Sequence, residues 1–127
     1  MFRSIARAAQ YGVPDAATSK CDTKLVRAAR DYIHAHLHEE GLSVSRVAAY
    51  CSSTRSHLTR AFPNATGLPP HAYINLQRVQ IARELIADGT PAASVAPAVG
   101  FVEQSHLIRR FKGVYGVTPG QYLTAIA

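Results

Sequence analysis

The stretch SHLTRAF at residues 56–62 returns as SHLIRRF at residues 105–111. Upstream of it, Val47-Ala48 matches Val95-Ala96 after a shift of one residue. At the offset of the repeat, three further pairs of residues agree: Gly67 with Gly116, Pro70 with Pro119, and Tyr73 with Tyr122. Self-similarity of this kind indicates that one supersecondary unit occurs twice in the chain.

Each copy of the unit is predicted to be a helix-turn-helix, in which a short helix leads through a tight turn into a second helix. In the first copy, Leu58 and Phe62 are four residues apart and face inward, which leaves Arg60 toward solvent. In the second copy, Leu107 and Phe111 repeat this spacing and leave three cations outside: Arg109, Arg110 and Lys112. An ordinary solvated helix could show one such face. Because the whole pattern is duplicated, we favour a helix that enters the major groove of DNA, which admits one α-helix.

Outward from the repeat, apolar residues recur at every third or fourth position and predict helices along most of the chain. The first begins at Asp22 or Thr23 and stops near Gly41. Pro63 is expected to close the third helix. The helices after the first are predicted at residues 44–50, 54–62, 71–87, 91–99, 103–115 and 119–123. No segment alternates with a period of two for long, so the sequence predicts an all-α fold.

The predicted helices divide the chain into an arm and a domain. Residues 1–21 are Ala-rich, with Gly12 and Pro14 as breakers, and we interpret them as a flexible N-terminal arm. The domain at 22–127 is expected to have three parts: a first helix-turn-helix subdomain at 22–68, a linker helix at 69–89 and a second subdomain at 90–127.

Composition limits the classes of partner. The chain has 127 residues, with 14 Lys and Arg against 8 Asp and Glu, so its formal net charge is +6. This balance favours an anionic partner, with nucleic acid ahead of an acidic membrane surface. No stretch of about 18 apolar residues occurs, so no transmembrane helix is expected.

Residues that could carry other chemistry are scattered. Cys21 and Cys51 form no Cys-x-x-Cys pair, so we expect neither a zinc-thiolate site nor a disulfide framework. His34, His36 and His38 lie on a polar helix face, where we interpret them as solvated side chains and not as metal ligands. No Walker loop, Gly-x-Ser-x-Gly or His-Glu-x-x-His motif occurs. We therefore expect no enzyme activity, no metal and no cofactor.

Four stretches of the chain form a signature, which is highly specific in the second half: Tyr73-Ile74 with Arg78, Ala82 and Leu85-Ile86; Val95-Ala96-x-x-Val99-Gly100-Phe101; Ser105-His106-Leu107-x-Arg109-x-Phe111-Lys112; and Gly116-x-x-Pro119-x-x-Tyr122. On these stretches the chain, from about Leu25 to Leu123, resembles the DNA-binding domain of AraC/XylS-type bacterial transcription regulators.

The resemblance implies seven helices in two helix-turn-helix subdomains, joined by the long helix at about 71–87. It implies a monomer on double-stranded DNA, with two recognition helices in successive major-groove segments about 34 Å apart. It also implies a cytoplasmic, nucleoid-associated activator or repressor, with RNA polymerase as a candidate protein partner. A second, effector-binding domain has no room here, so we expect a short single-domain regulator or the separated half of a larger one.

The resemblance carries over to particular residues of the two recognition helices. On the first, the residues expected to read base edges are Arg55, Ser56, Thr59 and Arg60. On the second, they are Gln104, Ser105, His106, Ile108 and Arg109. Arginine reads guanine bidentately, glutamine reads adenine, and isoleucine can touch a thymine methyl group. For His106, and for His57 at the equivalent position, helix packing or phosphate contact is the alternative. The residues expected to hold phosphates are Arg78, Arg110 and Lys112.

Four residues depart from the family's pattern. Pro97 falls inside the fifth predicted helix, and Pro63 replaces a basic residue. Ser52 replaces a glycine in the first turn, and Glu103 would repel phosphate unless it accepts from a cytosine amine. These departures keep a second interpretation open, a helical protein-interaction module or truncated half that has lost specific DNA reading.

Overall fold

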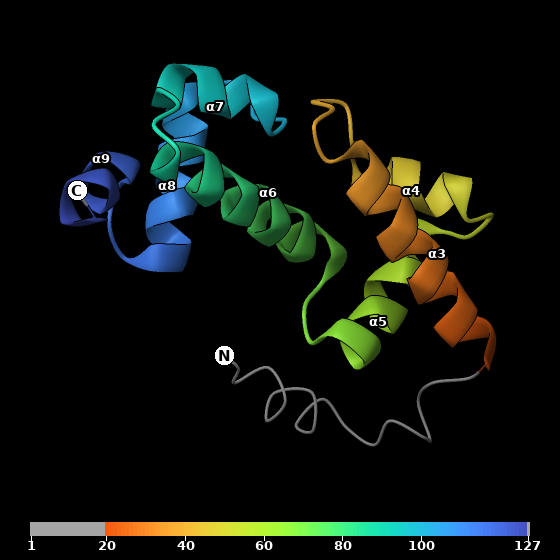
Figure 1. Ribbon diagram of the computed structural model, residues 1–127. Helices are drawn as coiled ribbons and strands as arrows, with labels where there is room; N and C mark the ends of the chain where they lie inside the picture. Colours follow the sequence, from red (N-terminus) through yellow and green to blue (C-terminus); the bar gives the residue numbers. More distant parts are fainter. Residues whose placement is uncertain (1–19, 127) are drawn as a thin grey trace. The chain divides into compact units, whose positions relative to one another are not determined.

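The computed structural model describes residues 20–126, which form seven α-helices and no strand (Figure 1). This confirms the all-α fold class. Of the expected arm, residues 1–19 lie outside the described part of the chain, whereas Lys20 and Cys21 belong to the first helix. The helices are α3 (Lys20–His36), α4 (Val44–Tyr50), α5 (Arg55–Thr66), α6 (Pro70–Ala87), α7 (Ala92–Ala98), α8 (Gln104–Tyr115) and α9 (Pro119–Ile126).

Pro63 does not close α5, contrary to the sequence-based expectation. The helix continues through it to Thr66 and ends at Gly67, whose φ of 84° places it in the left-handed region. The amide of Gly67 donates to the carbonyl of Pro63 at 2.8 Å. Proline has no N–H, so the carbonyl of Thr59 lacks its usual helical donor. Because Thr59 is exposed, water can donate to this carbonyl in place of the missing N–H.

Pro97 lies inside α7 without shortening it relative to its counterpart, because α7 and α4 both have 7 residues. The carbonyl that loses its donor is that of Ala93, and both residues are exposed to solvent. The amide of Val99 still reaches the carbonyl of Val95 at 3.1 Å. The second helix-turn-helix therefore forms despite this departure.

The described chain divides into two compact units. Unit 1 comprises residues 20–35 and 43–73, and unit 2 comprises residues 36–42 and 74–126. Helix α6 thus contributes its first turn to unit 1 and its remaining length to unit 2. The segment 36–42 comprises the last residue of α3 and the residues after it, and it groups with unit 2 although it lies between two parts of unit 1 in the sequence.

Unit 1 has a core made by α3, α4, α5 and the first turn of α6. The rings of Phe62 and Tyr73 meet edge to face at 5.2 Å, and the Tyr73 hydroxyl lies 2.7 Å from Nε2 of His34. This gives the one polar atom of a buried tyrosine a partner. The buried apolar side chains are Val26, Ala29, Ile33, Val44, Val47, Ala48, Leu58, Ala61, Phe62 and Tyr73.

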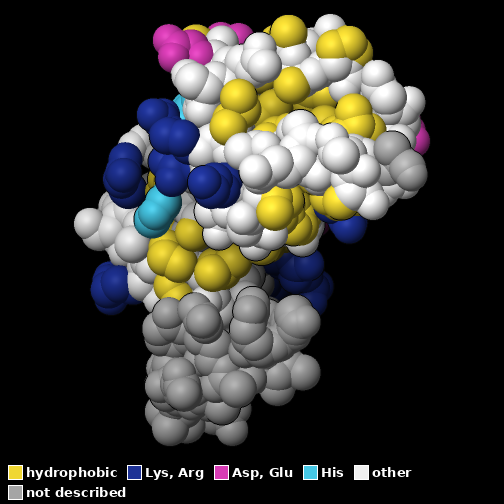
Figure 2. Space-filling model, turned by 90° about the vertical axis from the view of Figure 1, so that its left-hand side faces the viewer, with side chains coloured by type: hydrophobic (Ala, Val, Ile, Leu, Met, Phe, Trp, Pro, Cys, Tyr) yellow, Lys and Arg dark blue, Asp and Glu magenta, His cyan; other side chains and the backbone are white. Residues whose placement is uncertain are grey.

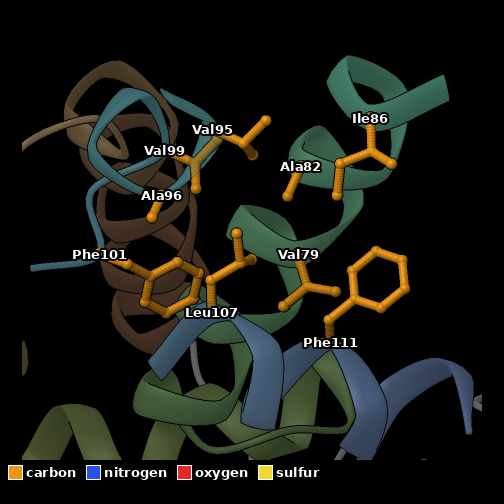
Figure 3. Close-up of a cluster of buried hydrophobic side chains, with 9 residues drawn as sticks. All are labelled: Val79, Ala82, Ile86, Val95, Ala96, Val99, Phe101, Leu107 and Phe111. Carbon is orange, nitrogen blue, oxygen red and sulfur yellow. The ribbon is translucent and has the colours of Figure 1, made fainter. Parts of the chain in front are cut away.

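Unit 2 has a separate core, in which side chains of α6, α7 and α8 point toward one another (Figure 3). Phe111 of α8 contacts Tyr115 and Tyr122, with ring centroids 4.8 and 5.8 Å apart. This attaches α9 to the unit. The core residues are Val79, Ala82, Ile86, Val95, Ala96, Val99, Phe101, Leu107 and Phe111.

Both helix-turn-helix turns need one residue in the left-handed region. After α7 it is Gly100, with a φ of 94°, and after α4 it is Ser52, with a φ of 55°. Ser52 is the only described residue other than glycine with a positive φ. A residue with a Cβ pays for this conformation with about 1–2 kcal/mol. The departure noticed in the sequence therefore carries strain in the folded chain.

Replacing Ser52 with glycine is expected to raise the free energy of unfolding by about 0.5–1 kcal/mol. Glycine relieves the strain at Ser52, although its greater freedom in the unfolded chain offsets part of the gain. Denaturant unfolding measures the change. The neighbouring Ser53→Gly is the matched control and should lower stability, because Ser53 has no positive φ to relieve. A destabilised Ser52→Gly protein would contradict the interpretation of this turn.

Candidate nucleic-acid interface

The two turns are held by the same hydrogen bonds. In unit 1 the amide of Ser53 donates to the carbonyl of Ala48 at 2.9 Å, and in unit 2 the amide of Phe101 donates to that of Ala96 at 2.9 Å. Helix α4 packs against α5, and α7 packs against α8. The internal repeat of the sequence is thus a repeat of geometry.

Helix α5 has a buried side and an exposed polar side. Leu58 and Phe62 are fully buried. The side chain of Thr54 accepts from the amide of His57 at 3.0 Å and caps the start of the helix. All four residues predicted to read bases from this helix are exposed: Arg55, Ser56, Thr59 and Arg60.

Helix α8 repeats this arrangement with more positive charge. Leu107 and Phe111 are fully buried. His106 and Ile108 are half-buried, and the His106 ring lies 5.5 Å from that of Phe101. The packing alternative for His106 is therefore present in the structure. The exposed residues among the predicted contacts are Gln104, Ser105, Arg109, Arg110 and Lys112.

Glu103 is the acidic residue at the start of α8. It occupies the N-cap position, but its side chain caps no amide. Instead, the hydroxyl of Ser105 donates to Oε1 of Glu103 at 3.3 Å. The carboxylate of Glu103 thus accepts a hydrogen bond from Ser105, one of the residues predicted to read bases. Elsewhere cations dominate, and on the face shown in Figure 2, Lys and Arg side chains are far more prominent than Asp and Glu.

Arg78 is a correction to the sequence-based prediction of phosphate contacts. Only 7% of it is exposed, and its guanidinium donates to two carbonyls of unit 2, from Nε to Leu37 at 2.9 Å and from Nη2 to Glu39 at 2.7 Å. It also lies over the ring of Phe101, 5.8 Å from the centroid. Burial lowers the pKa of Arg78, yet guanidinium stays charged in proteins. A guanidinium enclosed in this way holds the 36–42 segment and is not exposed for the expected phosphate contact.

Two of the three histidines flagged by the sequence, His34 and His36, have defined partners. Nδ1 of His36 lies 2.6 Å from Oε2 of Glu39, and His34 contacts Tyr73 as described above. Within residues 20–126, no group of three or more His, Cys, Asp or Glu side chains could hold a metal ion. None of the helices in this range is long and apolar enough to cross a bilayer.

One cluster near the interface was missed by the sequence analysis. Nε2 of His57, on α5, lies 2.7 Å from Oδ1 of Asp22, at the start of α3. The two residues are 35 positions apart. No periodicity or motif links them, because their contact depends on how α3 packs on α5. The repeat offered only a hint, since His57 has a counterpart in His106.

The same three parts occur in both units: a short helix, a turn with one residue in the left-handed region, and a second helix with an exposed polar side. This arrangement defines a double helix-turn-helix domain. A family model described as a helix-turn-helix domain matches residues 47–125. The chain belongs to this family, in its AraC-type branch.

Curated relatives share the domain over part of their length. The chain is 31% identical over 93 residues to a probable transcriptional regulator, LumQ, of Photobacterium leiognathi, covering 72% of this chain and 37% of the relative. It is 36% identical over 86 residues to the regulator MtrA of Neisseria gonorrhoeae, covering 66% and 28%. The chain thus spans about a third of the length of such relatives.

Solved structures show the same fold. The C-terminal domain of AraT, a response regulator from Geobacillus stearothermophilus, is 28% identical with a TM-score of 0.77, covering 80% of this chain and 84% of that one. An AraC-type regulator from Chromobacterium violaceum, 24% identical, superposes with a TM-score of 0.72 over 83% and 94% of the two chains.

Proposed function

We propose that this chain is the DNA-binding part of a transcription regulator that reads a specific double-stranded sequence through α5 and α8. The observation that carries the proposal is the duplicated helix with a buried apolar side and an exposed polar or basic side. Each unit presents one such helix after a helix-turn-helix turn, and a major groove admits one helix. Membership of the AraC-type family supports the same function.

We assign the exposed side chains two kinds of contact. Arg55, Ser56, Thr59 and Arg60 of α5 read the edges of bases in one groove segment, and those of α8 that do so are Gln104, Ser105, His106, Ile108 and Arg109. Arg110 and Lys112 hold phosphates, which fix the register without reading the sequence. Because one chain carries two reading helices, a single chain engages a bipartite site in the nucleoid of the cytoplasm.

RNA polymerase remains the candidate protein partner of a regulator of this kind. Three exposed apolar side chains of unit 2 do not suit phosphates: Val114 of α8, and Leu123 and Ile126 of α9. We propose that a protein surface, and not DNA, covers them. The alternative of a module without specific DNA reading makes the opposite prediction for DNA, that affinity is negligible even at low salt.

Replacing Arg109 with alanine is expected to lose about 1–3 kcal/mol of discrimination at one base pair, because a bidentate contact to that base is removed. Selection from random duplexes first defines the site, and titration of its single-base variants then measures discrimination. Lys112→Ala is the matched control, which should weaken binding to all sequences alike. Wild-type protein that binds every duplex equally would overturn the proposed function.

A further inference from the structure

A small polar pocket lies in unit 1, where the start of α3 meets the side of α5. It has a volume of about 120 Å³ and is lined by Asp22 of α3 and by four residues of α5: His57, Arg60, Ala61 and Asn64. Four of the five carry hydrogen-bonding groups. The pocket also borders the exposed side of α5, because Arg60 belongs both to its lining and to the predicted reading face.

The acidic residue of the pocket is engaged by the histidine. Nε2 of His57 lies 2.7 Å from Oδ1 of Asp22, and because a carboxylate only accepts, Nε2 must bear the proton. This contact fixes the orientation of the ring. Nδ1, the other ring nitrogen, takes no part in it. In this tautomer Nδ1 carries a lone pair and accepts, so the ring forms part of the pocket wall and the donors to an anion come from other residues.

Two donors of the pocket are available to a ligand. Among the described residues, neither Arg60 nor Asn64 has a hydrogen-bond or ion-pair partner. They are four residues apart on α5, so their side chains lie on neighbouring positions of one helix face. A guanidinium and an amide that line the same pocket suit a ligand rich in acceptors, and a phosphate is such a ligand.

The volume of the pocket distinguishes a single group from a whole effector molecule. Sites for small organic ligands occupy about 300–1,000 Å³, whereas a water molecule takes about 30 Å³. A pocket of about 120 Å³ holds one group the size of a phosphate. The remainder of such a ligand must lie outside, as the remainder of a DNA strand would.

We propose that this pocket binds one backbone phosphate at the edge of the groove segment that α5 reads, with Asn64 and Arg60 as donors and Asp22 positioning the His57 ring. The inference rests on the proposed function. Arg60 has five N–H donors, so it can hold the phosphate and still reach a base. The repeat does not supply the same donor in unit 2, because the counterpart of Asn64 is Gly113.

Neutral methylphosphonate linkages placed one at a time in the selected duplex test the proposal, in wild-type protein and in Asn64→Ala. We expect one linkage beside the α5 segment to weaken wild-type binding about 10-fold, the value of one charge-assisted hydrogen bond. Asn64→Ala should weaken binding to the unmodified duplex by a similar factor. The same linkage should then weaken the binding of the Asn64→Ala protein little further, because the contact is already lost. Alanine favours the helix, so folding is preserved. Gln80→Ala removes an exposed amide of α6 as the matched control and should change neither affinity.

Asp22→Ala separates positioning from simple repulsion. Removal of a negative charge alone would strengthen DNA binding, whereas the loss of the His57 orientation should weaken it and reduce the effect of the same linkage. The proposal is overturned if Asp22→Ala binds more tightly, or if every linkage weakens wild-type and Asn64→Ala binding equally. Each of these results leaves sequence-specific binding intact. Wild-type protein without any sequence preference would instead overturn the proposed function and this inference together.

Discussion

Replacing Gly100 with alanine is expected to lower the free energy of unfolding by about 3 kcal/mol or more. Its φ of 94° is strained for any residue with a Cβ, at about 1–2 kcal/mol. The added carbon would also clash with the carbonyl oxygen of Leu37 and would lie 2.8 Å from Nε of Arg78. Both atoms are fixed by their own hydrogen bond, so neither can move without breaking it. Denaturant unfolding measures the loss.

Gly116→Ala separates the two causes of the loss. Gly116 has a similar φ of 81°, but a Cβ there would meet no atom within 4 Å. We expect this control to cost only the backbone strain, about 1–2 kcal/mol. If both variants lose the same stability, close packing around Gly100 contributes nothing. If Gly100→Ala is as stable as the wild type, the description of this turn is wrong.

The repeat in the sequence was sufficient to predict the reading helices. Periodicity places Leu58 and Phe62 on one side of α5 and Arg60 on the other, whatever the rest of the chain does. The same holds for Leu107, Phe111 and α8. Local signals of this kind determined the fold class and the exposed face of each helix. The base contacts assigned to that face stay predictions, because they depend on the DNA as well as on the helix.

Interactions between distant segments could not be predicted in the same way. The resemblance to the family implied a phosphate contact for Arg78. Its actual partners are carbonyls 39 and 41 residues away, in the segment that follows the end of α3. The pocket at Asp22 and His57 has the same origin. Pro63 shows the converse limit, because a proline whose lost partner faces solvent need not end a helix.

The two copies of the unit have diverged in how they are stabilised. Unit 1 tolerates a strained Ser52 in its turn and caps α5 through the Thr54 side chain. Unit 2 keeps Gly100, leaves α8 without a side-chain cap and encloses Arg78 beside the turn. A glycine is needed in the second turn for space as well as for its φ. Replacing the glycine of the first turn therefore costs less stability than replacing that of the second. This agrees with the presence of Ser52 in the first turn and Gly100 in the second.

Replacing Arg78 with methionine is expected to lower the free energy of unfolding by about 3 kcal/mol. Methionine keeps an unbranched, flexible side chain but has no donor, so the carbonyls of Leu37 and Glu39 each lose a hydrogen bond to a charged group. If Arg78 instead clamped a phosphate, its loss would spare stability and reduce the salt dependence of DNA binding by about one unit. Arg110→Ala supplies that second pattern as the matched control, because Arg110 is exposed. Denaturant unfolding combined with DNA titrations at several salt concentrations distinguishes the two roles. If the Arg78→Met protein is fully stable and the salt dependence of its DNA binding is reduced, the phosphate contact of Arg78 is supported. If it is destabilised and the salt dependence is unchanged, the guanidinium is the group that fastens the 36–42 segment to unit 2.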